Sequence, residues 1–180
     1  MTTKRTMYHT YKRGQIILAD FKPSVGNELK GMHFAIVISK NDSPNNGVVT
    51  VIPLSSKNKN YYVDLGDFLI DSIFDEMDKK IEEIKNANTD ELTINEMTNR
   101  LAVLGSINLH AENYLKRNKT TYAMVQNISS ISKFKIKKYE SNYDPLKHIR
   151  LSNELFNKID SKIIELYTSL KWFDIEISQC

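Results

Sequence analysis

Histidine is the residue type in this 180-residue chain best suited to proton transfer near neutral pH, and it occurs at positions 9, 33, 110 and 148. An imidazole with an ordinary pKa of about 6.5 can serve as a general acid or a general base. His110 and His148 have no nearby partner at the spacing of a metal site, and the one cysteine is the final residue, Cys180. A multi-cysteine metal site and an intrachain disulfide framework are therefore excluded.

His33 differs from the other histidines because it lies in a segment with a distinctive glycine and proline spacing. That segment starts Arg13-Gly14-Gln15-Ile16, passes through Asp20, Pro23 and Gly26-Asn27-Glu28, and ends Lys30-Gly31-Met32-His33-Phe34-Ala35-Ile36-Val37-Ile38-Ser39. Two later segments combine branched apolar residues with serines, namely Val51–Ser56 (VIPLSS) and Val125–Lys133 (VQNISSISK). The glycine-rich loops that bind nucleotides and the GxSxG element of serine hydrolases do not occur.

These segments closely resemble the MazF/PemK toxins. The family opens, in consensus, R-G-D/E-I-x-x-x-D-x-x-P, then G-S-E-Q-x-G-x-R-P-x-V-V-I-S. Val51–Ser56 is similar to the family's P-[IL]-[TS] strand end, and Val125–Lys133 to its Q-I-R-T-I-D-K strand. The resemblance implies an SH3-like barrel that forms a homodimer, binds single-stranded RNA in a basic groove and is silenced by a protein antitoxin. It also implies cleavage without metal or cofactor, by attack of the RNA 2′-hydroxyl on the scissile phosphate.

The same resemblance implies roles for individual residues. His33 occupies the position of the family arginine in G-x-R-P, and Ser55 that of the strand-end threonine or serine; Glu28 matches the loop glutamate. We expect these three to be catalytic and Lys30, Lys57, Ser56 and Asn127 to bind RNA. An imidazole at position 33 supplies an exchangeable proton where arginine supplies a permanent charge. Leu29, Phe34 and Ser129 also depart from the family pattern, which leaves the target sequence open.

The elements that must position these residues are mostly short strands. Branched or alternating residues predict strands at Gln15–Phe21, His33–Ser39, Val48–Leu54 and Tyr61–Leu65, with a turn over Asn41–Gly47 that ends in the hairpin signal Asn46-Gly47. Thr120–Ile128 resumes the strand pattern, and Phe134–Tyr139 continues it. Closely spaced strands of this kind are typical of a small barrel.

Helical spacing interrupts and then ends the strand pattern. Apolar residues recur at helical intervals from Ile70 to Ile84 and again after Thr93, where Thr93 and Glu96 form a capping box. Ser152 caps a last helix with an apolar stripe from Leu155 to Leu170. This pattern, taken with the resemblance, predicts one mainly β domain over 1–180: a small barrel, SH3-like as the resemblance implies, with an α-helical insertion at about 66–118 and a C-terminal helix.

Charge is unevenly distributed along the chain. Residues 66–119 contain 11 acidic and 7 basic residues, whereas the remainder contains 11 acidic and 18 basic residues. A basic body attracts phosphate backbones, whereas the acidic insertion argues against a direct phosphate contact there. Aromatic residues available for base stacking are Phe21, Phe34, Tyr61 and Tyr62, although such residues in strands are more often part of the core.

Neither a transmembrane run nor a signal peptide is apparent, so the expected compartment is the cytoplasm. Two alternatives to a metal-independent endoribonuclease toxin remain open. One is a weakened barrel that binds RNA or protein without cleaving; the other is a gyrase-directed toxin of the CcdB type, which shares the fold. Arginine reintroduced at position 33 separates the first alternative from the nuclease, and DNA damage without RNA fragments would indicate the second.

Overall fold

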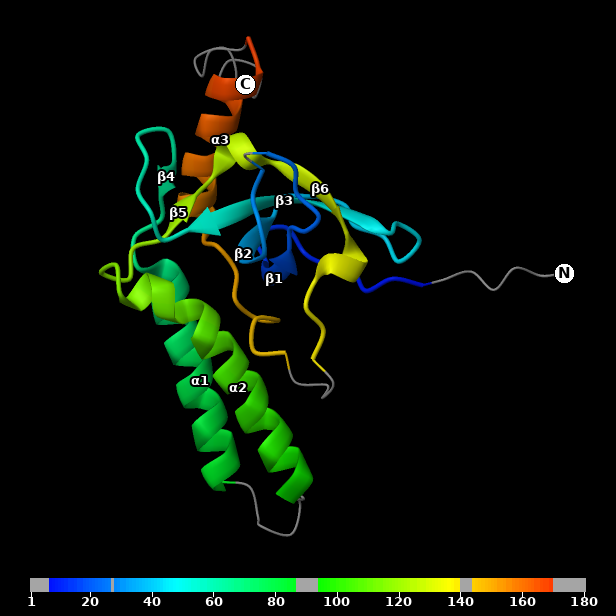
Figure 1. Cartoon of the computed structure of the whole chain (residues 1–180), viewed down its shortest axis with the longest axis vertical. Helices are drawn as coiled ribbons and strands as arrows, with labels where there is room; N and C mark the ends of the chain where they lie inside the picture. The colour runs from blue at the N-terminus through cyan, green and yellow to red at the C-terminus, as the bar shows by residue number, and fades with distance from the viewer. Residues whose placement is uncertain (1–6, 27, 87–93, 140–143, 170–180) are drawn as a thin grey trace, which may run out of the picture.

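The protein is described here by a computed structural model that covers residues 7–26, 28–86, 94–139 and 144–169. Its strands are β1 (Ile16–Asp20), β2 (Met32–Val37), β3 (Val48–Ser55), β4 (Val63–Asp64), β5 (Tyr122–Ala123) and β6 (Ser129–Ser132). Its helices are α1 (Phe68–Asn86), α2 (Ile94–Leu115) and α3 (Asn153–Tyr167), with short 3-10 turns η1 (Val125–Asn127) and η2 (Lys133–Lys135) (Figure 1). No described helix combines the length and apolarity that crossing a bilayer requires.

The strands form one antiparallel sheet in the order β1-β2-β3-β5-β4, and β6 also pairs with β3. β3 therefore has β2 along one edge, and β6 and then β5 along the other. After β6 the chain returns to β1: Ile136 bridges Ala19, and the N–H of Lys137 donates to the carbonyl of Leu18 at 2.8 Å. This contact closes β1, β2, β3 and β6 into a small barrel, as the strand pattern predicted.

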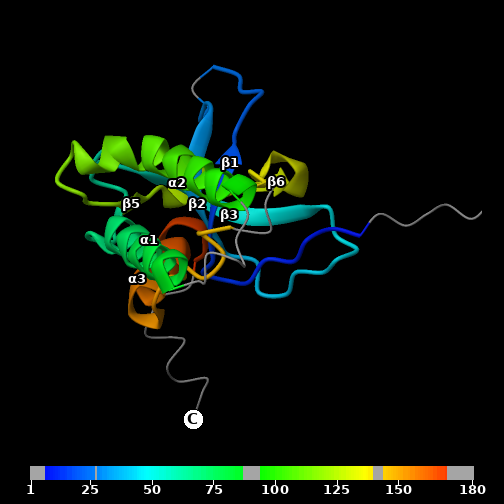
Figure 2. The same cartoon turned by 90° about the horizontal axis from the view of Figure 1, so that it is seen from below.

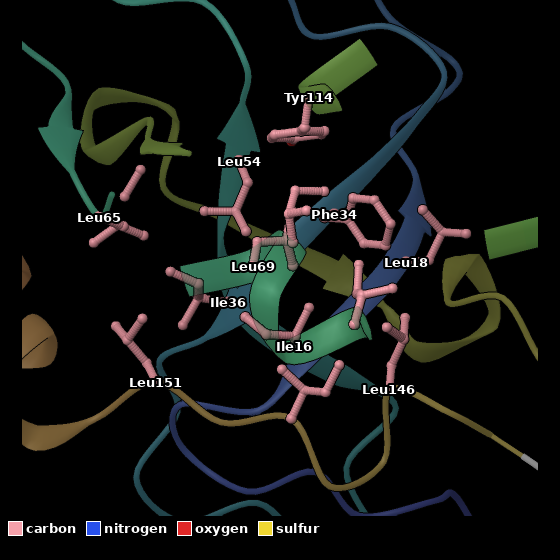
Figure 3. Packing of buried hydrophobic residues seen from close by; sticks show 14 of the residues in the cluster. Ile16, Leu18, Phe34, Ile36, Leu54, Leu65, Leu69, Tyr114, Leu146 and Leu151 are labelled. Atoms are coloured by element: carbon pink, nitrogen blue, oxygen red, sulfur yellow. The ribbon is translucent and has the colours of Figure 1, made fainter. Parts of the chain in front are cut away.

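Alternation along the strands produces two hydrophobic clusters, because successive side chains point to opposite faces. In β1, Ile17 and Ala19 belong to the barrel interior, whereas Ile16 and Leu18 face the helices. The interior cluster consists of Tyr11, Ile17, Ala19, Phe21, Ala35, Val37, Val49, Val51, Ile131 and Ile136. The larger cluster lies between the outer face of the sheet and the helices (Figure 3).

The helices α1 and α2 pack side by side and extend away from the sheet (Figures 1 and 2). Near the sheet, α1 buries Leu69, Ile70 and Ile73 in the larger cluster, and most of the buried residues of α2 join them there. The segment at about 66–118 thus contains helices, and their bases are part of the main core. The predicted capping residue Thr93 lies outside the described residues.

Helix α3 begins as predicted, since the Ser152 hydroxyl accepts the N–H of Leu155 at 3.3 Å. The guanidinium of Arg13 holds this helix to the barrel. It donates to both carboxylate oxygens of Asp160, at 2.7 and 2.9 Å, and lies 4.0 Å from the ring centroid of Phe156. Arg13, the first residue of the opening motif, therefore acts structurally. Leu170, the last predicted residue of the stripe, lies outside the described residues.

Two strand predictions are wrong. Phe134–Tyr139 does not continue a strand, because the Ser132 hydroxyl accepts the N–H of Phe134 at 3.3 Å and begins the turn η2. The predicted strand Thr120–Ile128 is limited to β5, since the chain bends into η1 directly after Met124. In both places local hydrogen bonds compete with the ladder that the residue pattern favoured.

The predicted turn over Asn41–Gly47 lies in the connection between β2 and β3. The N–H of Asn46 donates to the carbonyl of Ser43 at 3.1 Å, so the reversal is centred on Pro44 and Asn45. The Asn46 side chain accepts the N–H of Val48, also at 3.1 Å, and so leads the chain into β3. Asn46-Gly47 is therefore the end of this connection and not the centre of its turn.

Candidate functional site

His33 and Ser55 lie at the same end of neighbouring strands. Ala35 pairs with Pro53 across the antiparallel β2–β3 ladder, and His33 and Ser55 each lie two residues beyond that pair, toward the same end. The chain enters β2 at Gly31, whose φ of +82° is in the region that favours glycine. The carbonyl of Gly31 accepts the N–H of Phe21 at 2.9 Å, which fixes the start of the strand.

A cavity of about 560 Å³ opens at these strand ends, and we call it the strand-end cavity. Four of the predicted site residues line it, namely His33, Ser55, Ser56 and Lys57. The remaining lining residues come from β2, β3, α2 and the loops: Leu29, Met32, Phe34, Leu54, Lys59, Tyr62, His110, Asn113, Tyr114, Arg117 and Met124. Among the described residues that line this cavity there is no carboxylate, so its charged side chains are all basic.

The other three predicted site residues, Glu28, Lys30 and Asn127, line a neighbouring cavity of about 530 Å³, the loop cavity. The two cavities share Leu29, Lys59, Tyr62 and Met124, so they form adjoining parts of one surface depression. The structure thus brings His33 and Ser55 together but places Glu28 in the adjoining cavity. In the described part of the chain, no cluster of three or more histidine, cysteine or carboxylate side chains is arranged to hold a metal ion.

The ring of His33 is oriented by its backbone neighbour. Its Nε2 lies 3.1 Å from the carbonyl oxygen of Lys30. A carbonyl can only accept, so Nε2 carries the proton in this contact and Nδ1 is the nitrogen that exchanges a proton in the neutral ring. The ring also makes an edge contact with Phe21, with centroids 6.1 Å apart. His33 is therefore held with one nitrogen engaged and the other available for chemistry.

Ser55 and Glu28 make local hydrogen bonds. The Ser55 hydroxyl accepts the N–H of Lys57 at 2.9 Å and lies 3.2 Å from the carbonyl of Lys57, to which it donates. The Glu28 carboxylate accepts the N–H of Val25 at 2.8 Å and so closes its own loop. A ligand that uses the Ser55 hydroxyl as a donor must replace its bond to the Lys57 carbonyl.

Aromatic and basic side chains lie together where the two cavities join. The Lys59 ammonium is 5.7 Å from the ring centroid of Tyr61 and 5.6 Å from that of Tyr62. Hydrogen bonding to Tyr61 is the main cause of a raised pKa at Lys59, which keeps the ammonium charged. By contrast, Phe21 and Phe34 are buried in the two clusters. Of the four aromatics considered for stacking, Tyr61 and Tyr62 line the loop cavity, whereas Phe34 lines the strand-end cavity but is only 1% exposed.

Helix α2 and the turn that follows it place further polar groups in the strand-end cavity. His110 and Asn113 of α2 and Arg117 of the turn line it, and sequence analysis assigned them no role. Their spacing of three and then four residues, with Tyr114 between, is that of one helical face, so helical periodicity could have grouped them. Burial lowers the pKa of His110 below its ordinary value, and the charges of Lys137 and His33 lower it further.

Comparison with known proteins finds one family that is similar to the first part of the chain. Residues 12–86 match the family of PemK-like, MazF-like toxins of type II toxin-antitoxin systems. The match includes α1 and ends before the Val125–Lys133 segment. No curated protein matches the sequence.

Two solved structures are similar to the chain. MazF (Form-I) from Deinococcus radiodurans has a TM-score of 0.45 and 11% identity, covering 88% of this chain and 96% of that one. An endoribonuclease in complex with its cognate antitoxin, from Mycobacterial species, has a TM-score of 0.44 and 14% identity, covering 90% and 98%. The matched segment 12–86 contains β1, β2 and β3 and with them His33 and Ser55. The likeness to the PemK-like, MazF-like toxins of type II toxin-antitoxin systems thus covers this part of the chain.

Proposed function

We propose that this protein is the toxin of a toxin–antitoxin system and a metal-independent endoribonuclease that cuts single-stranded RNA. The observation that carries the proposal is the strand-end cavity, where His33 and Ser55 lie among basic side chains within the toxin-like segment. A cavity with basic lining and no described carboxylate, such as the strand-end cavity, attracts a phosphodiester. A histidine beside it can transfer protons near neutral pH.

The proposed reaction uses the substrate's own nucleophile. The 2′-hydroxyl loses its proton to a base, and the 2′-oxygen forms a bond to phosphorus. The bond from phosphorus to the 5′-oxygen breaks, and that oxygen takes a proton from an acid. The products are a 2′,3′-cyclic phosphate and a 5′-hydroxyl, so the step requires no metal-bound water.

In this proposal His33 exchanges a proton through Nδ1, and Ser55 donates to a phosphoryl oxygen once its bond to Lys57 is replaced. Glu28, in the adjoining loop cavity, orients the RNA or a partner side chain. Lys57 and Ser56 bind phosphate at the strand-end cavity, and Lys30 and Asn127 bind the strand where it continues into the loop cavity.

The partners follow from the same assignment. We propose that the protein works in the cytoplasm as a homodimer and that an antitoxin covers the joined cavities. An antitoxin segment that folds on binding would exclude RNA by occupying the same basic surface. Its carboxylates would complement Lys30, Lys57 and Lys59, which are exposed on this surface.

The test is incubation of the purified chain with a long single-stranded RNA in EDTA. We expect cuts at a few defined sites, with a cyclic phosphate and a 5′-hydroxyl at each cut. His33→Ala should lower the rate at least about 100-fold, the usual contribution of general acid–base catalysis. His148→Ala removes an exposed histidine that lines neither cavity and should cleave like wild type.

The outcomes separate the competing functions. RNA that is bound but not cut by folded wild-type protein would overturn the nuclease and favour a binding barrel. Cleavage that survives His33→Ala would keep the nuclease and remove His33 from its mechanism. DNA damage in cells without RNA fragments would indicate a gyrase-directed toxin instead.

A further inference from the structure

One face of α2, with the turn that follows it at residues 116–119, supplies the strand-end cavity with groups that the barrel itself lacks. His110, Asn113, Tyr114 and Arg117 follow one another at helical spacing and all line the cavity. Tyr114 is buried and makes an edge contact with Phe34 of β2, with ring centroids 5.9 Å apart. Figure 3 shows Tyr114 beside Phe34 and Leu54 at the edge of the core. This contact fixes His110 one turn before Tyr114, and Arg117 about one turn after it, at the cavity wall.

The residues of this face that line the cavity are neutral or basic, whereas residues 66–119 as a whole have a net negative charge. The carboxylate nearest in sequence, Glu112, is exposed and paired with Lys116 at 2.7 Å, and neither residue lines the cavity. In the described part of the chain Arg117 forms no salt bridge. Its guanidinium is therefore available for an anion, and planar paired donors match the oxygens of a phosphoryl group.

We propose that α2 completes the RNA-cleaving site: His110 is the base for the 2′-hydroxyl, His33 is the acid for the 5′-oxygen, and Arg117 binds the non-bridging phosphoryl oxygens. This inference rests on the proposed function and extends its site to the helical insertion. It requires two imidazoles at one phosphate, and the strand-end cavity is lined by both.

The two imidazole rings account for every proton that moves in the cleavage step. Neutral His110 takes the proton of the 2′-hydroxyl as the new P–O bond forms. Protonated His33 gives its Nδ1 proton to the 5′-oxygen as the old P–O bond breaks, while its Nε2 keeps its own proton, hydrogen-bonded to the Lys30 carbonyl. Arg117 stabilises the negative charge that develops on the phosphoryl oxygens. Proton exchange with water then restores neutral His110 and protonated His33.

Electrostatics favours His110 as the base. The charges facing it are His33 from β2 and Lys137 after η2, and both lower its pKa beyond the effect of burial. The other charged residues that line the same cavity are also basic: Lys57, Lys59 and Arg117. His110 is thus neutral at the pH where a base is needed, and activity should rise with pH along a limb that lies below the ordinary histidine value.

The experiment measures single-turnover cleavage of the same RNA in EDTA, as a function of pH, for His110→Ala and Arg117→Ala. We expect His110→Ala to lower the rate about 100-fold or more, to remove the rise with pH on the acidic side, and to be partly rescued by added imidazole. Arg117→Ala should lower the maximal rate about 100-fold, with Arg117→Lys intermediate.

Matched controls come from α2 and the turn that follows it. Asn108→Ala changes an exposed residue of α2 that does not line the cavity. Lys116→Ala removes the same unit of charge as Arg117→Ala from a position outside the cavity. Both controls should cleave within about twofold of wild type, and thermal melting should show that all five variants are folded.

Each result bears on one of the two proposals. If wild type cleaves and loses activity in His33→Ala, but folded His110→Ala and Arg117→Ala keep the wild-type rate and pH profile, the helix has no part in catalysis and only this inference fails. A rate loss in His110→Ala with an unchanged pH profile and no imidazole rescue also overturns the assignment of His110 as the base. If wild type does not cleave any RNA, the proposed function fails and this inference fails with it.

Discussion

At the scale of single residues, the structure separates basic side chains that hold the fold from those that face the cavities. Arg13 belongs to the opening motif but fastens α3 to the barrel through Asp160. Lys133, the last residue of the third motif, is buried and paired with Asp42 at 2.7 Å, with both side chains at most 3% exposed. A buried charge of this kind requires its partner. Neither residue is available for RNA, although both lie in segments that resemble an RNA-cleaving family.

The electrostatic relation between His33 and His110 gives a residue-scale prediction. A proton on His33 disfavours a proton on His110, so His33→Ala should raise the pKa of His110 toward its ordinary value of 6.5. Burial and Lys137 still act in the variant, so the pKa should remain below 6.5. Titration of the imidazole Cε1 proton signals by NMR measures the shift.

A matched control for that titration is His148→Ala. His148 does not contribute to the lowered pKa of His110. Its removal should therefore leave the titration of His110 unchanged. An unchanged titration in His33→Ala as well would mean that the two rings do not interact and would count against a shared site.

At the scale of elements, an aromatic contact joins the end of α2 to β2. Tyr114 is 5% exposed and packs on Phe34, whose neighbour in β2 is His33. The contact therefore links the helix that carries His110, and the turn after it that carries Arg117, to the strand that carries His33. Tyr114 therefore matters for catalysis through its packing, because it positions other side chains and takes no part in the chemistry itself.

The element-scale prediction follows from that contact. Tyr114→Ala should lower the free energy of unfolding by about 3 to 5 kcal/mol, as for other large buried aromatic residues. It should also slow RNA cleavage, because the helix face is no longer fixed against β2. Urea unfolding and the cleavage assay measure the two effects.

Tyr114→Phe keeps the ring and is the conservative control. It should cleave like wild type, because the edge contact with Phe34 remains. If Tyr114→Ala is destabilised but cleaves at the wild-type rate under conditions where it is folded, the anchoring role of Tyr114 in catalysis is wrong.

At the scale of the whole molecule, the helical insertion and the barrel share one core. The larger cluster draws residues from the strands, from the bases of α1 and α2, and from α3. The outer ends of α1 and α2 extend away from the sheet (Figure 1), and Ile81, Ile94 and Leu101 are exposed there. The insertion is therefore divided into a base that completes the fold and an outer part that does not.

Two deletions test this division. Removing residues 66–118 takes away Leu69, Ile70, Ile73 and Ile107 from the core, so we expect a chain that does not fold cooperatively. Replacing only residues 82–99 with a flexible glycine-serine linker should leave a folded protein that still cleaves RNA, since Tyr114, His110 and Arg117 are kept. Circular dichroism during thermal melting, followed by the cleavage assay, distinguishes the two chains. A folded and active 66–118 deletion would contradict both the shared core and the catalytic role of α2.

The sequence by itself determined the barrel strands, the helices and the toxin resemblance. Short runs such as Ile16–Asp20 and Met32–Val37 carry their strand signal locally, because alternation and β-branching act between near neighbours. The cap at Ser152 is equally local. The strands at Thr120–Ile128 and Phe134–Tyr139 were predicted wrongly, because turns fixed by single hydrogen bonds ended them.

Only the tertiary structure decided which side chains share a cavity. His33 and Ser55 meet because the β2–β3 register brings two strand ends together, whereas Glu28 lies in the adjoining cavity despite its place in the same motif. His110 and Arg117 enter through the packing of Tyr114 on Phe34, a contact between residues 80 positions apart. The net negative charge of residues 66–119 did not indicate that this segment supplies basic groups to the cavity. A helix carries different charges on different faces, and only the tertiary packing decides which face lines the cavity.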